Sequence, residues 1–342
     1  MVDERVNYSM SDKIDFVLTW VDGNDPEWQK VKKQYISNKD TGDNRDIRFR
    51  DWGNLQFWFR GVESFVPWVN KIHFITWGHL PKWLNLNHPK LNVVNHQDYI
   101  PEKYLPTFSS HVIELNLHRI KGLADKFVYF NDDTFITRHM KKSDFFVNGL
   151  PCDTAVIRPL INTFRMSTGA IVSNNMEIIN TNYNKNEVIK NNFFKWFNLS
   201  YGKHFISTLL MMPYKSFAGF LNPHLPNSFL KQTFEELWQD EYEVLNKTCY
   251  NKLRDGRDVN QWLVRYKQLV EGKFSPRNPS IGRTYNLTND NKEVVDAIRT
   301  QKYKMICIND NDKDPIRHFE KEKKLLINAF QEILPEKSSF EV

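Results

Sequence analysis

Acidic and amide side chains follow directly after three apolar runs of the chain. The three segments are Trp20-Val21-Asp22-Gly23, Asn131-Asp132-Asp133 and Asn309-Asp310-Asn311. Carboxylate oxygens are the ligands that Mg²⁺ and Mn²⁺ prefer, and these ions often bridge protein carboxylates to substrate phosphates. We therefore predict Asp132 and Asp133 as ligands of Mg²⁺ or Mn²⁺, with Asp310 as a third. An Asn-Asp pair is also a common turn former, so one such segment alone would indicate a turn.

Short strands and helices must position these side chains. Apolar runs bounded by turn-forming residues predict buried strands at 14–21, 72–77, 91–94, 127–130 and 305–308. Helical patterns lie between them, at 55–65 and 109–123. Strands that alternate with helices predict an α/β fold with a mostly parallel sheet. Ligands of such sheets bind beyond the carboxyl ends of the strands, so we expect the three acidic segments to meet in one crevice.

A helical region is expected to interrupt this alternation. From about 185 to 275 the chain shows helical patterns rich in Phe and Trp, which predict a helical lobe inserted before the last strand. We predict one catalytic domain over 1–342. After the last strand, Phe319, Leu326 and Phe330 fall at helical spacing in a terminal helix that ends before Pro335.

Composition limits the location and the partners. The 342 residues carry a net charge of +6 and contain neither a signal-peptide pattern nor an apolar run near the roughly 18 residues of a membrane helix. We expect a cytoplasmic protein, at the inner face of the membrane if the terminal helix docks on anionic lipid, although such helices more often pack on their own core. The chain lacks a Lys/Arg block with interleaved aromatic residues, so we expect no nucleic-acid partner.

Two further groups of residues are candidates for phosphate binding. Arg48 and Arg50 precede a predicted helix start at Asn54, where backbone N–H groups suit phosphate, although a plain capped helix fits equally well. Arg254 and Asp258 lie just before an aromatic helix, where a surface ion pair is the simpler interpretation.

Histidines provide the candidates for acid–base chemistry. His224 lies between two prolines, and a stiff loop would hold its imidazole as a general base, although a lone loop histidine is usually incidental. Glu114 and His118 are four residues apart, so on a helix they would share one face, with Arg119 adjacent. A solvated helix face explains that spacing as well.

Several segments together resemble the Stealth family, which includes bacterial capsule hexose-1-phosphate transferases and the animal lysosomal-enzyme N-acetylglucosamine-1-phosphotransferase. The family's first conserved region is similar to 14–26, and its second to 48–136, which contains Asn131-Asp132-Asp133. The third region resembles Pro223-His224-Leu225-Pro226, and the fourth resembles 254–258 with the aromatic helix that follows. Segments 306–311 and 335–341 are similar to the closing part of the family's sequences.

The resemblance implies a nucleotide-sugar transferase type of fold and a phosphotransferase activity. A hexose 1-phosphate, with N-acetylhexosamine 1-phosphate foremost, would pass from a UDP-sugar to a hydroxyl of an oligosaccharide or lipid-linked saccharide. A divalent metal would take part, the nucleoside monophosphate would leave, and phosphodiester linkages would form in a bacterial capsular or cell-surface receptor polysaccharide. Alternatives are a metal-dependent glycosyltransferase that releases UDP and a non-catalytic sugar-binding module, for which the 14% aromatic residues would form stacking platforms.

The resemblance also implies roles for individual residues. His224 would be the general base, with Asp258 either orienting it or serving in its place, and Arg50, Arg119 and Arg254 would clamp phosphate oxygens. The residues expected to bind substrate are Trp20, Asp22, Gly23, Asn54, Glu114, His118 and Arg119.

Overall fold

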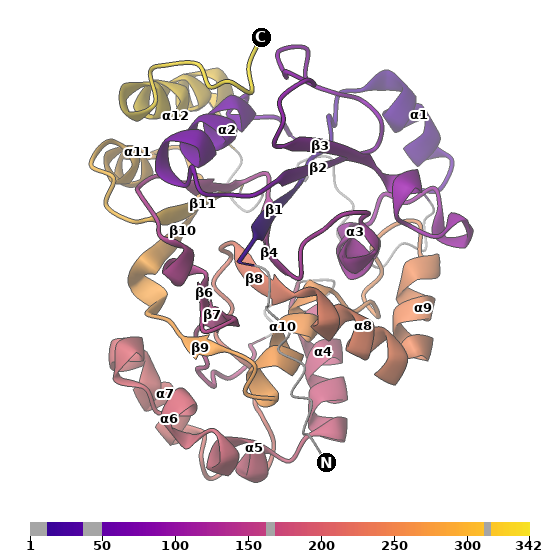
Figure 1. Cartoon of the computed structure of the whole chain (residues 1–342), viewed down its shortest axis with the longest axis vertical. Helices are drawn as coiled ribbons and strands as arrows, with labels where there is room; N and C mark the ends of the chain where they lie inside the picture. Colours follow the sequence, from indigo (N-terminus) through magenta and orange to yellow (C-terminus); the bar gives the residue numbers. More distant parts are fainter. Residues whose placement is uncertain (1–11, 37–49, 162–167, 311–315) are drawn as a thin grey trace, which may run out of the picture.

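A parallel-rich sheet organises the protein. The computed structural model describes residues 12–36, 50–161, 168–310 and 316–342, so the predicted contributions of Arg48 and Asn311 lie outside the described residues. The strands of the main sheet, in spatial order, are β3 (Leu91–Asn95), β2 (Ile72–Thr76), β1 (Ile14–Thr19), β4 (Lys126–Asn131) and β8 (Asn227–Leu230). The first four run parallel, and β8 pairs antiparallel with β4. The α/β fold predicted from the sequence is confirmed (Figure 1).

The last predicted strand belongs to a second, smaller sheet. This sheet has the order β10 (Gly282–Asn286), β11 (Met305–Asn309) and β5 (Thr134–Ile136), with β11 antiparallel to β5. Since β5 follows the turn after β4, the two sheets meet there, and the Ile308 N–H donates to the Asp133 carbonyl at 2.8 Å. A third sheet contains β6 (Phe146–Val147), β7 (Leu150–Asp153) and β9 (Ser275–Pro276).

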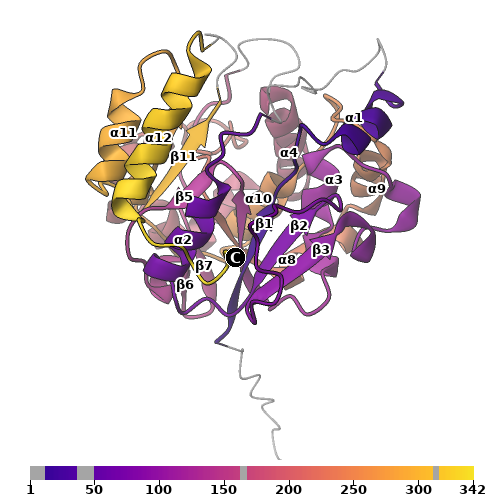
Figure 2. The same cartoon turned by 90° about the horizontal axis from the view of Figure 1, so that it is seen from above.

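Two hydrophobic clusters lie on opposite faces of the main sheet. Successive side chains of a strand point to opposite faces, so Phe16 and Leu18 join one cluster and Val17 joins the other. Helices α2 (Leu55–Phe65), α11 (Lys292–Arg299) and α12 (Phe319–Ile333) belong to the first cluster. Helices α3 (Ser110–Leu115), α4 (Thr168–Asn182), α8 (Lys231–Asp240), α9 (Tyr242–Tyr250) and α10 (Gln261–Val270) belong to the second (Figure 2).

The terminal helix packs on the core. Phe330 of α12 stacks on Phe57 of α2 with ring centroids 5.4 Å apart, and Leu326 is buried beside it. Arg60 of α2 makes two 2.8 Å hydrogen bonds to the Glu341 carboxylate, and both side chains are almost fully buried. The apolar face of α12 is therefore covered by protein.

The helical region differs in extent from the predicted lobe. Its helices begin at Thr168 with α4, and β8 lies within the range 185–275 and forms an edge of the main sheet. Helices α5 (Lys185–Asn191), α6 (Phe193–Trp196) and α7 (Phe205–Leu210) form the end of the molecule drawn at the bottom of Figure 1. Helix α1 is Pro26–Lys33, and 3₁₀ helices cover His96–Asp98, Glu102–Tyr104, Leu117–Arg119, Lys142–Asp144, Leu199–His204 and Pro279–Ile281.

The helix predicted at 109–123 is split in two. The α-helical part ends at Leu115, and a 3₁₀ turn at Leu117–Arg119 follows. Asn116 interrupts the helix because its side-chain amide donates to the Val112 carbonyl at 2.8 Å, which satisfies a carbonyl at the helix end. Glu114 and His118 therefore do not share one helix face.

Candidate functional site

Residues from all three predicted segments line one cavity of about 520 Å³ at the carboxyl ends of the main strands, although Asp22 of the first segment does not. Trp20 follows β1, Asp132 and Asp133 follow β4, and Asp310 follows β11. Although β11 lies in a different sheet from β1 and β4, the hydrogen bond between Ile308 and Asp133 brings its end to the same place. The crevice expected from the strand ends is present in the structure.

Asp132 and Asp133 form an acidic pair at the cavity. Asp132 is exposed to the cavity, and the protein around it partly desolvates its carboxylate. This desolvation and the adjacent Asp133 charge raise the pKa of Asp132 to about 7. Asp133 Oδ1 is buried without a hydrogen-bond partner among the described residues. Two adjacent carboxylates, one with a buried oxygen that lacks a partner among the described residues, fit a divalent cation.

Two other potential ligands lie beside Asp133. Atoms of Asp133, His224 and Cys307 all lie within 4.8 Å of one another. Burial and the Asp133 charge raise the pKa of the Cys307 thiol well above its usual range, and the thiol donates to Asp133 Oδ2 at 3.4 Å. A protonated thiol is a poor metal ligand, so the set that fits Mg²⁺ or Mn²⁺ best is the carboxylate pair.

The carboxylate of Asp310 accepts hydrogen bonds from a guanidinium group and an indole. Arg50 donates to both of its carboxylate oxygens, at 2.7 and 2.9 Å, and Trp52 Nε1 donates to one of them at 3.1 Å. The prediction of Asp310 as a third metal ligand therefore has less support than that of Asp132 and Asp133. Its contacts instead hold the Arg50 guanidinium at the cavity wall.

The start of helix α2 also faces the cavity. Arg50, Trp52 and Asn54 line it, and the Asn54 side chain makes no capping hydrogen bond at the helix start. The first N–H groups of a helix attract anions, and a neighbouring guanidinium adds positive charge. This arrangement suits the phosphate groups that the sequence predicted here.

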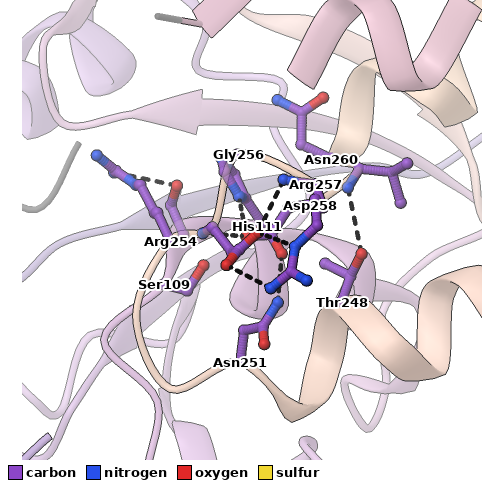
Figure 3. A network of polar contacts seen from close by, with 12 residues as sticks. Ser109, His111, Thr248, Asn251, Arg254, Gly256, Arg257, Asp258 and Asn260 are labelled. Atoms are coloured by element: carbon purple, nitrogen blue, oxygen red, sulfur yellow. Dashed lines mark hydrogen bonds and ion pairs between the residues drawn. The ribbon is translucent and has the colours of Figure 1, made fainter. Parts of the chain in front are cut away.

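A buried histidine–carboxylate pair supports another part of the wall (Figure 3). His111 Nδ1 lies 2.8 Å from Asp258 Oδ2, and Asp258 is 0% exposed. The Asn251 amide and the Asp255 backbone N–H also donate to this carboxylate, at 2.6 and 2.9 Å. His111 lines the cavity, whereas Asp258 lies behind it. Asp258 thus orients His111 and fixes its Nδ1 as the donor nitrogen.

His111 was not among the residues predicted from the sequence. It stands three residues before Glu114 in α3, a spacing that places the two side chains on one face of a helix, and this signal could have identified it. Both residues line the cavity. The carboxylate partner of His111 is distant in sequence, and no local pattern could reveal it.

Glu114 and Arg254 complete the wall near His111. Tyr129 Oη donates to Glu114 Oε1 at 3.2 Å, and Glu114 Oε2 is buried without a partner among the described residues. Burial raises the pKa of Glu114, against the opposing effects of His111 and Arg254. Arg254 Nη2 donates to Ser110 Oγ at 3.1 Å.

His224 lies near the acidic pair. The Asn131 amide donates to its Nε2 at 2.8 Å, and both residues line the cavity. The sequence offered Asp258 as a partner that could orient His224, but the hydrogen bond of Asp258 goes to His111.

Four predicted substrate-binding residues lie outside the cavity lining. The Asp22 backbone N–H donates to His79 Nε2 at 2.7 Å, and Gly23 is buried. His118 is buried against Phe234, and Arg119 is exposed, its guanidinium 4.8 Å from the ring centre of a tryptophan.

Conserved-region models of one family match much of the chain. Stealth protein conserved region 1 matches residues 12–40, conserved region 2 matches 48–152 and conserved region 4 matches 296–342. The capsular polysaccharide phosphotransferase WcwK of Streptococcus pneumoniae is 47% identical over 334 residues, which cover 96% of this chain and 98% of WcwK. The chain belongs to the Stealth family. Conserved region 4 matches the C-terminal segment, so its predicted position at 254–258 is wrong.

Further Stealth relatives carry similar names. The receptor polysaccharide phosphotransferase WefC of Streptococcus gordonii is 40% identical over 338 residues, covering 97% of this chain and 100% of WefC. The solved galactosyltransferase LgtC, in complex with donor and acceptor sugar analogues, is 9% identical with a TM-score of 0.39, over 92% of this chain and 95% of that one. Membership of this Stealth group makes the chain a phosphotransferase of polysaccharide synthesis.

No helix in the described ranges is both long and apolar enough to cross a membrane.

Proposed function

We propose that the cavity transfers a sugar 1-phosphate from a UDP-sugar to a saccharide hydroxyl, with release of UMP. The product would be a phosphodiester within a bacterial capsular or cell-surface receptor polysaccharide, as the names of the Stealth relatives suggest. The observation that carries the proposal is the pairing of adjacent carboxylates, Asp132 and Asp133, with two guanidinium groups, Arg50 and Arg254, around one cavity. Carboxylates suit a divalent cation and guanidinium groups suit phosphate, and a nucleotide diphosphate requires both.

The bond changes follow from the substrate chemistry. The acceptor oxygen attacks the phosphorus next to the sugar, the bond from that phosphorus to the bridging oxygen breaks, and UMP leaves with the bridging oxygen. The sugar C1–O bond stays intact, so the anomeric configuration of the donor is retained. A cation held by Asp132 and Asp133 would supply positive charge at the diphosphate when bound. Arg50 and Arg254 would bind and orient phosphate oxygens.

The acceptor hydroxyl must lose its proton to a residue of the cavity. The sequence named His224, but a neutral amide, that of Asn131, holds its imidazole. The carboxylate of Asp258 holds His111 instead, and a carboxylate stabilises the imidazolium that forms when the base takes up a proton. We therefore propose His111 Nε2 as the proton acceptor, with Asp258 as its positioning residue. His224 would orient substrate beside the acidic pair.

The product nucleotide tests this function. The purified protein would be incubated with UDP-sugars and Mg²⁺ or Mn²⁺, with and without an oligosaccharide acceptor, and the nucleotide would be identified by chromatography. UMP that appears only with metal and acceptor would support the proposal. UDP would identify a glycosyltransferase, and no turnover of any donor would favour a sugar-binding module. Asp133→Asn serves as the inactive control.

The location of the reaction is also a proposal. We propose that the enzyme works in the cytoplasm on an oligosaccharide or a lipid-linked acceptor. Its cysteines, Cys152, Cys249 and Cys307, are buried free thiols, which fits a reducing compartment.

A further inference from the structure

The short helices α6 and α7 lie at one end of the molecule (Figure 1). Large apolar side chains are exposed on them. We call residues 190–215 the apical lobe; it contains α6, the 3₁₀ helix Leu199–His204 and α7. Its exposed apolar residues are Phe193, Phe194, Leu199, Ile206, Leu209, Leu210 and Tyr214, with Leu199 89% and Phe194 82% exposed. Soluble proteins rarely leave so many large apolar groups together on the surface unless a partner or a membrane covers them.

Helix α7 is turned with its polar side inward. Ser207 Oγ donates to the Ile157 carbonyl at 2.8 Å, and Thr208 Oγ1 accepts from the Ile157 N–H at 3.0 Å. Ile206, Leu209 and Leu210 are exposed. Their spacing of three and four residues places them on one face of the helix. Surface helices normally bury this face, so the hydrogen bonds to Ile157 enforce the exposure.

The apical lobe is firmly attached to the rest of the molecule. Trp196 is 0% exposed and packs against Phe217, Phe220 and Phe274. Lys185 donates to the carbonyls of Met211, Met212 and Tyr214, which satisfies the carbonyl groups after the end of α7. The exposed face is therefore part of a packed structure.

The charge of this region has one sign. Residues 188–234 contain five lysines and no Asp or Glu, although the whole chain has 41 acidic residues. Lys190, Lys203 and Lys215 are exposed, and none of them forms an ion pair with an acidic residue in the part of the chain that the structure describes. A surface of apolar side chains and lysines without acids complements a bilayer with anionic headgroups.

We propose that the apical lobe docks the enzyme on an anionic lipid surface. A second copy of the chain fits less well, because a symmetric interface would place the lysines of this lobe opposite the same lysines without an acid to pair with them. Terminal helix α12 cannot take this role, since its apolar face packs on the core.

The position of the apical lobe suits a membrane-held acceptor. Thr168 and Ile171, at the start of α4, line the cavity, and α4 ends at Asn182, just before α5 and the lobe. Its 15 residues span about 22 Å. Docking would thus hold the cavity about one helix length from the lipid, within reach of a saccharide anchored there. This last step rests on the proposed function, whereas the docking does not.

Vesicle sedimentation of the full chain tests the docking. Wild-type protein is expected to sediment with vesicles of equal parts phosphatidylglycerol and phosphatidylcholine at low salt, and much less with phosphatidylcholine alone. The double variant Phe194→Glu, Leu199→Glu should bind at least about tenfold more weakly. Lys203→Gln should weaken binding about fivefold. Leu86→Glu, at a residue that is 54% exposed outside the lobe, is the matched control and should bind as wild type.

Further measurements separate the possible outcomes. UMP release with a soluble oligosaccharide should be unchanged in the double variant, so failure of docking and failure of the proposed function are distinguishable. Hydrogen exchange of the unaltered chain should slow in 193–214 when anionic vesicles are added, which tests the docking without any variant. The proposal is overturned if wild-type protein does not sediment with anionic vesicles or if the double variant binds them as wild type does. It is also overturned if the lobe instead mediates a dimerisation that vesicles do not affect.

Discussion

Replacing Asp258 with Asn should remove most of the activity while leaving the shape of the site intact. Asn has the same size, but it lacks the charge and presents an amide NH₂ where one carboxylate oxygen was. The carboxylate accepts from His111 Nδ1, the Asn251 amide and the Asp255 N–H at 2.6 to 2.9 Å. All three partners are donors, so the new NH₂ must face one of them. If the NH₂ group faces His111, it donates to Nδ1 and favours the tautomer that carries its proton on Nε2. In that tautomer Nε2 cannot accept the proton of the acceptor hydroxyl.

The size of the effect follows from these contacts. Loss of one hydrogen bond to a charged group is worth about 1.5 to 3 kcal/mol, which corresponds to about a tenfold to 150-fold loss of rate. The wrong tautomer adds to this loss, so we expect kcat to fall by about a hundredfold to ten-thousandfold, with little change in KM for the donor. The buried donor that loses its acceptor should lower the free energy of unfolding by about 1 to 3 kcal/mol.

The assay is UMP release as a function of pH, with thermal unfolding measured in parallel. His111→Gln should be as slow as Asp258→Asn, and the double variant no slower than His111→Gln alone, because both changes remove the same proton acceptor. Asp240→Asn, which removes an exposed ion-pair partner of Lys267, is the matched control and should retain kcat. If Asp258→Asn keeps kcat within about threefold of wild type while His224→Ala loses about a hundredfold, the base is His224 and our assignment fails.

Other changes test separate parts of the site. Asp132 must lose its proton to bind a cation, so with a pKa of about 7 its Mg²⁺ affinity should rise about tenfold from pH 6 to pH 8 by calorimetry, and chelation should stop UMP release. A flat affinity over that range would contradict the assignment. Arg50→Lys should raise KM for the UDP-sugar about tenfold, since a lysine cannot keep both contacts to Asp310; an unchanged KM would remove Arg50 from phosphate binding. Burial lowers the pKa of His118 to about 3. Below pH 6.5 the unfolded state therefore binds a proton at this residue and the folded state does not. The free energy of unfolding then falls by about 1.4 kcal/mol for each pH unit of acidification. The melting temperature of His118→Phe should therefore fall less than that of wild type between pH 6.5 and 5, and its turnover should be unchanged. A large loss of turnover would show that His118 takes part in the site.

The sequence was most informative where local pattern decides position. The polar segments after β1 and β4 predicted the cavity because the carboxyl ends of parallel strands meet at one edge. The spacing of Glu114 and His118 was misleading because it assumed one continuous helix, and Asn116 ends that helix between them.

Long-range contacts account for what the sequence could not predict. The partners His111 and Asp258 are 147 positions apart, and each is unremarkable in its own segment. Asp310 stays a predicted metal ligand, but its ion pair with Arg50, 260 positions away and just before α2, could not be read from either segment. The exposed face of α7 was also missed, since spacing alone does not say which side of an amphipathic helix meets the core.

The Arg50–Asp310 ion pair has a consequence for biosynthesis. Its two residues lie 260 positions apart. Arg60, in the second turn of α2, likewise pairs with a residue from the end of the chain, Glu341. A nascent chain in which residues 310 and 341 have not yet left the ribosome lacks the carboxylate that holds Arg50 at the cavity wall and the carboxylate that pairs with Arg60 of α2. Under the proposed role of Arg50, such a chain would not yet bind the donor, so catalytic competence would arrive together with completion of the fold.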